Sequence, residues 1–222
     1  MYHVSDGVKL SSVQSVDIVE RVVYEYLKPF GFRKHGRTLH RFVDGDISQV
    51  IHLQNGCPEK SVYGVLWVNL GIRVPECVER SFIVLQALKK YYHEYECNIR
   101  TRLGYLVDSE DTFYSLDNDP AEIGNDIVER LKEHATPVFD VLNSRDAILE
   151  HRKEFPRFDS MCNHLVLLEE AMILGRKGDL AQASCSFNKY YRKILKDCNN
   201  KAHIEYVEKL SEKLGITLDG HL

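Results

Sequence analysis

Arginines at strand-like spacing are the side chains of this sequence best suited to bind a ligand. With one histidine they form the candidate set Arg37, Arg41, His52, Arg73, Arg100 and Arg102. A guanidinium presents forked N–H donors that match the oxygens of phosphate and carboxylate groups. Residues two or four apart share a face of a strand, so Arg37 lies with Arg41, and Arg100 lies with Arg102. If both pairs share one face, it predicts a site for an anion or an acidic partner; the alternative is a solvated face whose arginines pair with helix carboxylates.

Acidic side chains form a second group, between residues 108 and 119. The group comprises Asp108, Glu110, Asp111, Asp117 and Asp119. Carboxylates are stabilised at helix N-termini, which makes an acidic helix-capping loop the simplest interpretation. The alternative is a negative patch that steers a basic partner protein. The spacing shows no convergent geometry for a metal ion or for an acid–base pair.

Motifs for catalysis and for cofactor binding are absent from the sequence. It contains no phosphate-binding P-loop, no GxGxxG, no GxSxG and no HExxH, the short motifs that mark nucleotide, hydrolase and zinc-protease sites. His35, His40 and His52 form a loose group without the spacing of zinc ligands. Cys97 lies near two arginines that favour a thiolate, although a buried, inert thiol is the simpler interpretation. We therefore expect no catalytic residue, no metal and no cofactor.

Length, composition and charge are those of a soluble globular protein. The chain has 222 residues, of which 44% are hydrophobic and 28% charged, close to the averages for soluble domains. Its 29 Lys and Arg against 33 Asp and Glu give a net charge of −4, which disfavours nucleic acid as a partner. No secretory signal is evident at the start, and the most apolar stretch is too short to cross a membrane. Six cysteines without a CxxC pair are expected to be reduced in a cytoplasm.

The first half of the chain has the pattern of a helix followed by strands. Ser11 and Gln14 have capping-box spacing ahead of an apolar helical stripe that ends before Pro29. Strands are expected at residues 38–43, 46–53, 63–72 and 97–106, with a helix over 81–95. Asp44-Gly45 favours a two-residue hairpin turn. That turn sets Phe42 opposite Ile47, His40 opposite Gln49 and Arg37 opposite His52, which leaves Arg37, Arg41 and His52 on the face away from the core.

The second half of the chain is helical. Asp119, Pro120 and Glu122 occupy the N-cap, N1 and N3 positions of an expected helix. A short helix follows from Ser144 to about residue 153, and three more are expected at 159–174, 180–196 and 202–214. The sequence thus predicts an α+β fold: an antiparallel sheet of four to five strands packed with helices in residues 1–154, followed by a helical tail in residues 155–222 that docks on it.

Several blocks of sequence resemble one bacterial family. They are residues 28–34 (KPFGFRK), 36–41 (GRTLHR), 49–54 (QVIHLQ), 68–72 (VNLGI), 97–104 and 111–114. In this order they are similar to the domain of unknown function 4304 family, over residues 13–150. That family has no settled activity, so the resemblance implies a fold more than a function. In the tail, residues 171–190 resemble the helical hairpin of a tetratricopeptide repeat.

Two functional hypotheses of different class follow from these patterns. The first is a non-enzymatic protein that binds another protein and, by analogy with acidic immunity proteins, neutralises a basic toxin. The second is an anion or phosphate-ester site on the arginine face, with His40 or His52 as acid–base group if the protein is an enzyme. A homodimer, in which an uncovered sheet edge pairs between two copies, remains a third alternative.

Overall fold

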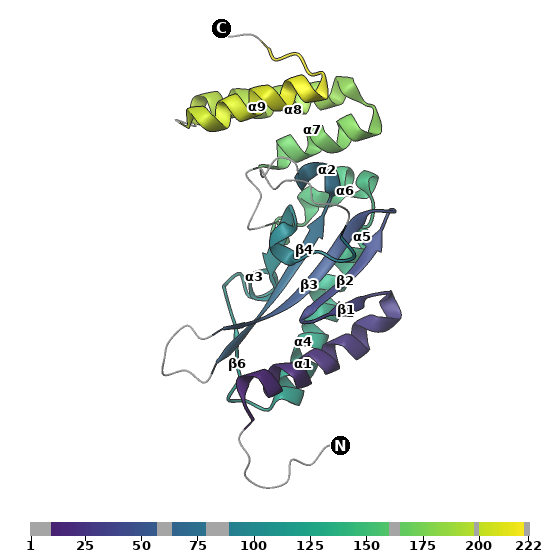
Figure 1. Cartoon of the computed structure of the whole chain (residues 1–222), viewed down its shortest axis with the longest axis vertical. Helices are drawn as coiled ribbons and strands as arrows, with labels where there is room; N and C mark the ends of the chain where they lie inside the picture. Colours follow the sequence, from purple (N-terminus) through teal and green to yellow (C-terminus); the bar gives the residue numbers. More distant parts are fainter. Residues whose placement is uncertain (1–9, 57–63, 79–88, 160–164, 198–199, 220–222) are drawn as a thin grey trace.

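A twisted antiparallel sheet forms the centre of the molecule. The computed structural model describes residues 10–56, 64–78, 89–159, 165–197 and 200–219 (Figure 1). In this part of the chain the sheet has the order β1-β2-β3-β4-β5, and β6 pairs with β4. The strands are β1 (Arg33–His35), β2 (Thr38–Val43), β3 (Ile47–Gly56), β4 (Val65–Arg73), β5 (Ile99–Arg102) and β6 (Tyr114–Ser115). The predicted α+β fold with an antiparallel sheet is confirmed.

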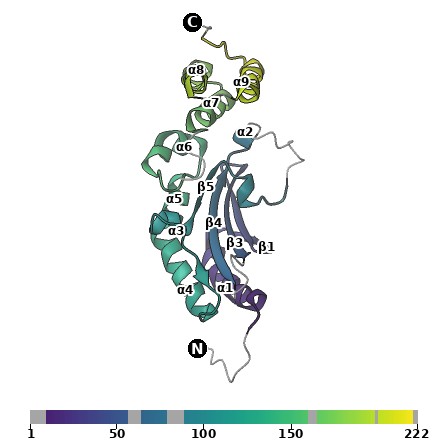
Figure 2. The ribbon, with the colours of Figure 1, turned by 90° about the vertical axis from the view of Figure 1, so that its left-hand side faces the viewer.

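One face of the sheet is covered by helices, as the edge-on view of Figure 2 shows. The α-helices before the tail are α1 (Ser12–Leu27), α2 (Pro75–Val78), α3 (Leu103–Val107), α4 (Pro120–Arg130), α5 (Thr136–Val141) and α6 (Arg145–His151). Short 3-10 turns are η1 (Lys28–Phe30), η3 (Glu94–Glu96) and η5 (Arg152–Glu154), and η4 (Leu131–Ala135) is a π-helical turn. The predicted caps are confirmed: Ser11 and Gln14 form a capping box, and Asp119 accepts from the N–H groups of Ala121 and Glu122.

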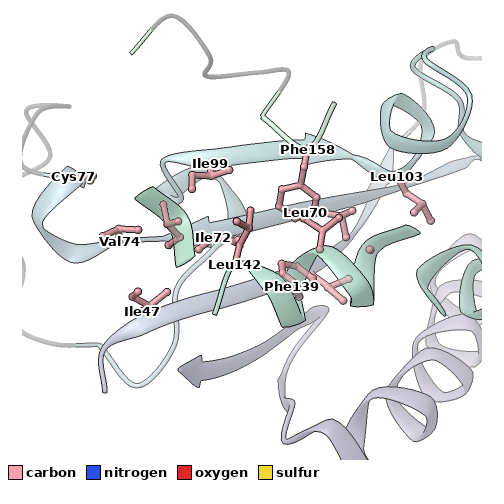
Figure 3. Close-up of a cluster of buried hydrophobic side chains, with 14 of the residues drawn as sticks. Ile47, Leu70, Ile72, Val74, Cys77, Ile99, Leu103, Phe139, Leu142 and Phe158 are labelled. Carbon is pink, nitrogen blue, oxygen red and sulfur yellow. The ribbon is translucent and has the colours of Figure 1, made fainter. Parts of the chain in front are cut away.

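The hydrophobic core lies between the helices and the face of the sheet that they cover, which we call the helical face. Leu70 and Ile72 of β4 point toward Phe139 and Leu142 of the α5 region (Figure 3). The ring of Phe139 meets the ring of Phe158 edge to face at a centroid distance of 5.3 Å. These side chains are almost completely buried, so apolar burial fixes which face of each strand turns inward.

The β2–β3 register differs from the prediction by one residue. Val43 pairs with Ile47, and Thr38 pairs with His52, so the loop has three residues instead of two. Arg145 binds the side chains of Asp44 and Asp46 and holds both within the turn. The observed register also places Leu39 opposite Ile51 in the core, whereas the predicted one put Leu39 on the polar face. Phe42, predicted to be a core residue, is consequently 43% exposed.

Two other predicted elements also need correction. The strand predicted over 97–106 ends at Arg102, and the chain turns into α3, where the backbones of Glu110 and Thr112 pack so closely against Gly104 that a Cβ would not fit. The predicted helix over 81–95 is absent from residues 89–93, and only the short turn η3 follows. The rest of that predicted helix lies outside the described residues.

The helical tail consists of α7 (Val166–Lys177), α8 (Leu180–Asp197) and α9 (Lys201–Leu214). It lies beyond α2 and α6 at the end of the molecule opposite α1 (Figure 1), with α7 in contact with both. Gly178 and Gly215 end α7 and α9 with φ values of 86° and 66°, a conformation that glycine adopts without strain. The helix predicted over 159–174 begins at Val166 among the described residues. The division into two units and the tetratricopeptide likeness stay predictions.

Candidate functional site

The sheet face opposite the helices carries most of the predicted binding residues. We call it the strap face, because residues 89–97 (the strap) cross it. Cross-strand pairing arranges it in rows: Ser48 lies opposite Arg73, Gly71 opposite Arg100, and Asn69 opposite both His52 and Arg102. Side chains of directly paired residues project from the same face. Arg73, Arg100, Arg102 and His52 therefore share one face, as a continuous surface across β3, β4 and β5.

Arg37 and Arg41 lie on the other, helical face. Arg41 donates to Gln49 at 2.6 Å and to the carboxylate of Asp140 at 2.8 Å, and Arg37 lies 3.8 Å from the carboxylate of Asp17. The two arginine pairs of the sequence analysis are thus separated by the sheet. The one-residue difference in register is the reason, because it moves every β2 side chain to the other face relative to β3.

The strap lies directly on the strap face. Its own fold depends on Glu96, which accepts from the backbone N–H of His93 at 2.9 Å and from the ammonium of Lys89 at 2.6 Å. Burial opposes ionisation of Glu96, but these hydrogen bonds outweigh it and lower its pKa. A Cβ on Gly71 would come within 2.7 Å of Cβ and Sγ of Cys97. The strap therefore approaches β4 as closely as it does only because residue 71 is glycine.

Two arginines under the strap each have a buried N–H group without an acceptor among the described residues. Arg73 is 5% exposed; its guanidinium lies 3.9 Å from the centroid of the Tyr92 ring, and its Nη1 has no partner in the described part of the chain. Nε of Arg100 and Oγ of Ser48 are likewise buried without a partner there. Arg102, by contrast, forms an ion pair with Asp111 and donates to Asn69 at 3.1 Å.

Histidines and tyrosines of the strap and of β1–β3 form a ring cluster beside these arginines. Tyr91 stacks on His35 at a centroid distance of 3.5 Å and lies 5.5 Å from His93 and 6.1 Å from His40. His93 in turn meets His52 edge to face at 6.2 Å. The sequence pattern did not identify Tyr91, Tyr92 or His93, because the strap was expected to be helical; Ser48 was expected on this face but not as a binding residue.

Two of these histidines make the stability of the protein depend on pH. Burial is the main cause that lowers the pKa of His40 and of His52. For His40, the charges of His35 and Arg33 lower the pKa further, while a backbone hydrogen bond at Lys90 opposes the shift. For His52, the charges of His93 and Arg37 lower the pKa further, while the charge of Glu94 opposes the shift. Below about pH 6.5 the unfolded chain then binds more protons than the native protein. We expect the free energy of unfolding, measured in urea, to fall by up to about 1.4 kcal/mol per pH unit for each histidine.

The double variant His40→Gln/His52→Gln should flatten this dependence between pH 7.5 and 5.5. His151 supplies a control of opposite sign, since its hydrogen bond to Glu154 raises its pKa and stabilises the fold at low pH. Replacing it with glutamine should steepen the loss toward acid. An unchanged slope in the double variant would assign the acid sensitivity to other groups.

The acidic group of the sequence analysis is largely engaged within the molecule. Asp108 binds Arg130 at 2.8 Å, and this hydrogen bond is the main cause that lowers the pKa of Asp108. Asp111 pairs with Arg102, and Asp119 caps α4. Asp117 lies beside Ser115 in the turn before α4, and Glu110 is exposed next to Asp111. The charge offered to a basic partner is accordingly smaller than the sequence predicts.

The surroundings of Cys97 do not favour a reactive thiol. Burial is the main cause that raises the pKa of the Cys97 thiol, which keeps it protonated and unreactive near neutral pH. No group of three or more His, Cys, Asp or Glu in the described ranges is arranged to hold a metal ion. None of the helices there is both long and apolar enough to span a membrane.

Comparison with known proteins identifies the family of this chain. The model of a domain of unknown function, DUF4304, matches residues 23–141, which run from the C-terminal part of α1 to the end of α5 and include the strap and its sheet face. No curated protein and no solved structure matches the chain. The chain therefore belongs to the DUF4304 family.

Proposed function

We propose that this protein binds an anionic ligand, a phosphate ester or a carboxylate, at the strap face. The observation that carries the proposal is the pair Arg73 and Arg100, whose buried N–H groups find no acceptor among the described residues. Buried polar groups in native proteins are almost always hydrogen-bonded, and a buried charge without a counter-charge is strongly destabilising. An anion between the two guanidiniums would supply both the missing acceptors and the missing charge.

The neighbouring groups suit the same ligand. Ser48 lies opposite Arg73, and its buried Oγ also lacks a partner in the described chain, so it can donate to a third oxygen. The Tyr92 ring shields the Arg73 guanidinium from water, and a low local dielectric strengthens the attraction between a guanidinium and an anion. This site is distinct from Arg102, whose charge Asp111 already balances.

The double variant Arg73→Gln/Arg100→Gln tests the proposal with inorganic phosphate as the probe. Phosphate should raise the Tm of the wild-type protein above that in chloride of equal ionic strength, because a ligand that binds only the native state stabilises it, by about 2.7 kcal/mol at 100 times Kd. In the double variant this gain should disappear. The matched control is Arg130→Gln, which removes an arginine already paired with Asp108 and Asp126 and should retain the gain.

The unliganded double variant should also be at least as stable as wild type, because it removes the buried charge of Arg73 and the partly buried charge of Arg100, neither of which has an ion pair among the described residues. Equal phosphate responses in all three proteins would refute the site. A large loss of stability in the double variant without phosphate would show that the arginines are already satisfied in the native protein.

A protein partner is the second candidate function, and one observation favours it. Tyr95 of the strap and Phe113 next to β6 are 59% and 51% exposed, and Trp67 contacts both Phe113 and Arg102. Tryptophan, tyrosine and arginine are the side chains that dominate binding energy at protein interfaces. Copurification from native cells at low and moderate salt, compared with a Phe113→Ser variant, tests it: a stoichiometric partner, such as a toxin, should be lost with the variant. Its retention would exclude this surface.

A further inference from the structure

We infer that a hollow beside β1 and β2 is a second ligand site and takes an aromatic phosphate of mononucleotide size. The hollow has a volume of about 400 Å³, within the range of small-molecule sites. Its lining includes Arg33, His35, His40, Phe42, Lys90 and Tyr91, together with Lys34 and Arg41, whose charged groups pair with Glu20 and Asp140. It opens on the strap face at the β1 edge, whereas Arg73 and Arg100 lie on β4 and β5. The inference uses different residues from the proposed function and does not depend on it.

The hollow offers positive charge that the protein does not neutralise. The side chains of Arg33 and Lys90 are exposed, and the structure shows no ion pair for either among the described residues. Lys34 also lines the hollow, but its ammonium pairs with Glu20 of α1. Nδ1 of His40, a residue only 5% exposed, has no partner in the described chain. Two cations thus converge at the hollow, where a phosphate needs donors.

Aromatic rings form another wall of the hollow. Tyr91 is held by its stack on His35, and Phe42 is 43% exposed beside His40, with the two rings 5.9 Å apart. An exposed phenylalanine on a strand and an ordered tyrosine give a planar ligand two surfaces for stacking. Stacking of a base on an aromatic side chain contributes about 1–3 kcal/mol in single-stranded nucleic-acid complexes.

Charge and rings together select the ligand class. Inorganic phosphate or a sugar phosphate meets only the cationic wall, and an uncharged nucleoside meets only the rings. A mononucleotide, or another aromatic phosphate of that size, meets both walls at once. The two contributions add in free energy, so the complete ligand should bind more tightly than either fragment.

Isothermal titration of the full chain with three probes tests this inference: adenosine 5′-monophosphate, adenosine and ribose 5-phosphate, at equal ionic strength. The monophosphate should bind at least tenfold more tightly than either fragment. Arg33→Gln should weaken its binding at least fivefold, and Tyr91→Leu should weaken it by a similar factor. Lys132→Gln is the matched control, because it removes one positive charge that is paired with Glu129 outside the hollow and should leave Kd unchanged.

Three outcomes would overturn the inference: no binding of the monophosphate, equal binding of monophosphate and ribose 5-phosphate, or equal effects of Arg33→Gln and Lys132→Gln. The Arg73→Gln/Arg100→Gln variant separates the two sites. It should lose the response to inorganic phosphate and keep the affinity for the monophosphate; loss of both would place the monophosphate at the arginines and refute a site in the hollow. Far-ultraviolet circular dichroism of each variant checks that the fold is intact.

Discussion

Replacing Arg152 with alanine is expected to lower the free energy of unfolding by about 3–5 kcal/mol, because it removes the cation from a buried ionic cluster. Arg152 is 5% exposed; it donates to the carboxylate of Asp159 at 2.9 Å and forms an ion pair with Glu169, which is completely buried. Two carboxylates thus share one guanidinium. Without it, both keep their desolvation penalty and lose their counter-charge.

Urea unfolding of the full chain measures this effect, and thermal unfolding should show a Tm lower by about 6–20 °C for a chain of this size. Arg130→Ala is the control, since its ion pairs with Asp108 and Asp126 are partly exposed and such pairs contribute at most about 1 kcal/mol. Arg152→Lys should lie between the two, because lysine keeps the charge but lacks the planar fork. A loss below 1 kcal/mol for Arg152→Ala would contradict the argument.

Because of its position, the loss of this ionic cluster should also affect the packing of the helical tail. Arg152 follows α6, whereas Glu169 belongs to α7, the first helix of the tail. The backbone oxygen of Glu169 also accepts from the thiol of Cys77 in α2 at 3.7 Å. The cluster therefore joins the tail to the elements at the end of the sheet, and its loss should loosen that attachment.

Local signals in the sequence predicted the starts of α1 and α4 correctly, because each signal depends on neighbouring residues. The capping box of Ser11 and the Asp119-Pro120 start need only a few residues of context, and both are confirmed. Alternation along β5 likewise placed Arg100 and Arg102 together. Helix caps and strand alternation each involve only one helix or strand, so they can be recognised from the sequence of that segment.

To predict the arginine site, one must know contacts between elements that are far apart in the sequence. Whether Arg41 shares a face with Arg73 depends on one residue of turn length, and the observed turn is held by ion pairs with Arg145, about 100 positions away in the sequence. The apolar pattern over 81–95 favours a helix, yet residues 89–97 form the strap because their contacts with β4 compensate for the lost helix. Long-range contacts of this kind leave no periodic signal.

Substituting Gly71 with alanine is expected to destabilise the protein by about 1–3 kcal/mol, the usual cost of inserting atoms into a packed site. The new Cβ would lie 2.7 Å from both Cβ and Sγ of Cys97 and 3.6 Å from the carbonyl oxygen of Glu94. Since Cys97 is anchored by its own backbone, relief requires the end of the strap to move away from β4. The buried thiol should then react faster with a disulfide reagent than in the wild-type protein.

A double-mutant cycle tests whether this clash is the cause. Cys97→Gly removes both atoms that the new Cβ would meet, so Gly71→Ala should cost less in that background than in the wild type, with a coupling energy of at least about 0.5 kcal/mol in urea unfolding. If the losses in the free energy of unfolding of the two single variants simply add in the double variant, the side chain of Cys97 does not clash with a Cβ at residue 71. Because the strap also covers Arg73 and carries Tyr91, a displaced strap should weaken phosphate and mononucleotide binding together. Selective loss of only one would mean that the two sites respond to different parts of the strap.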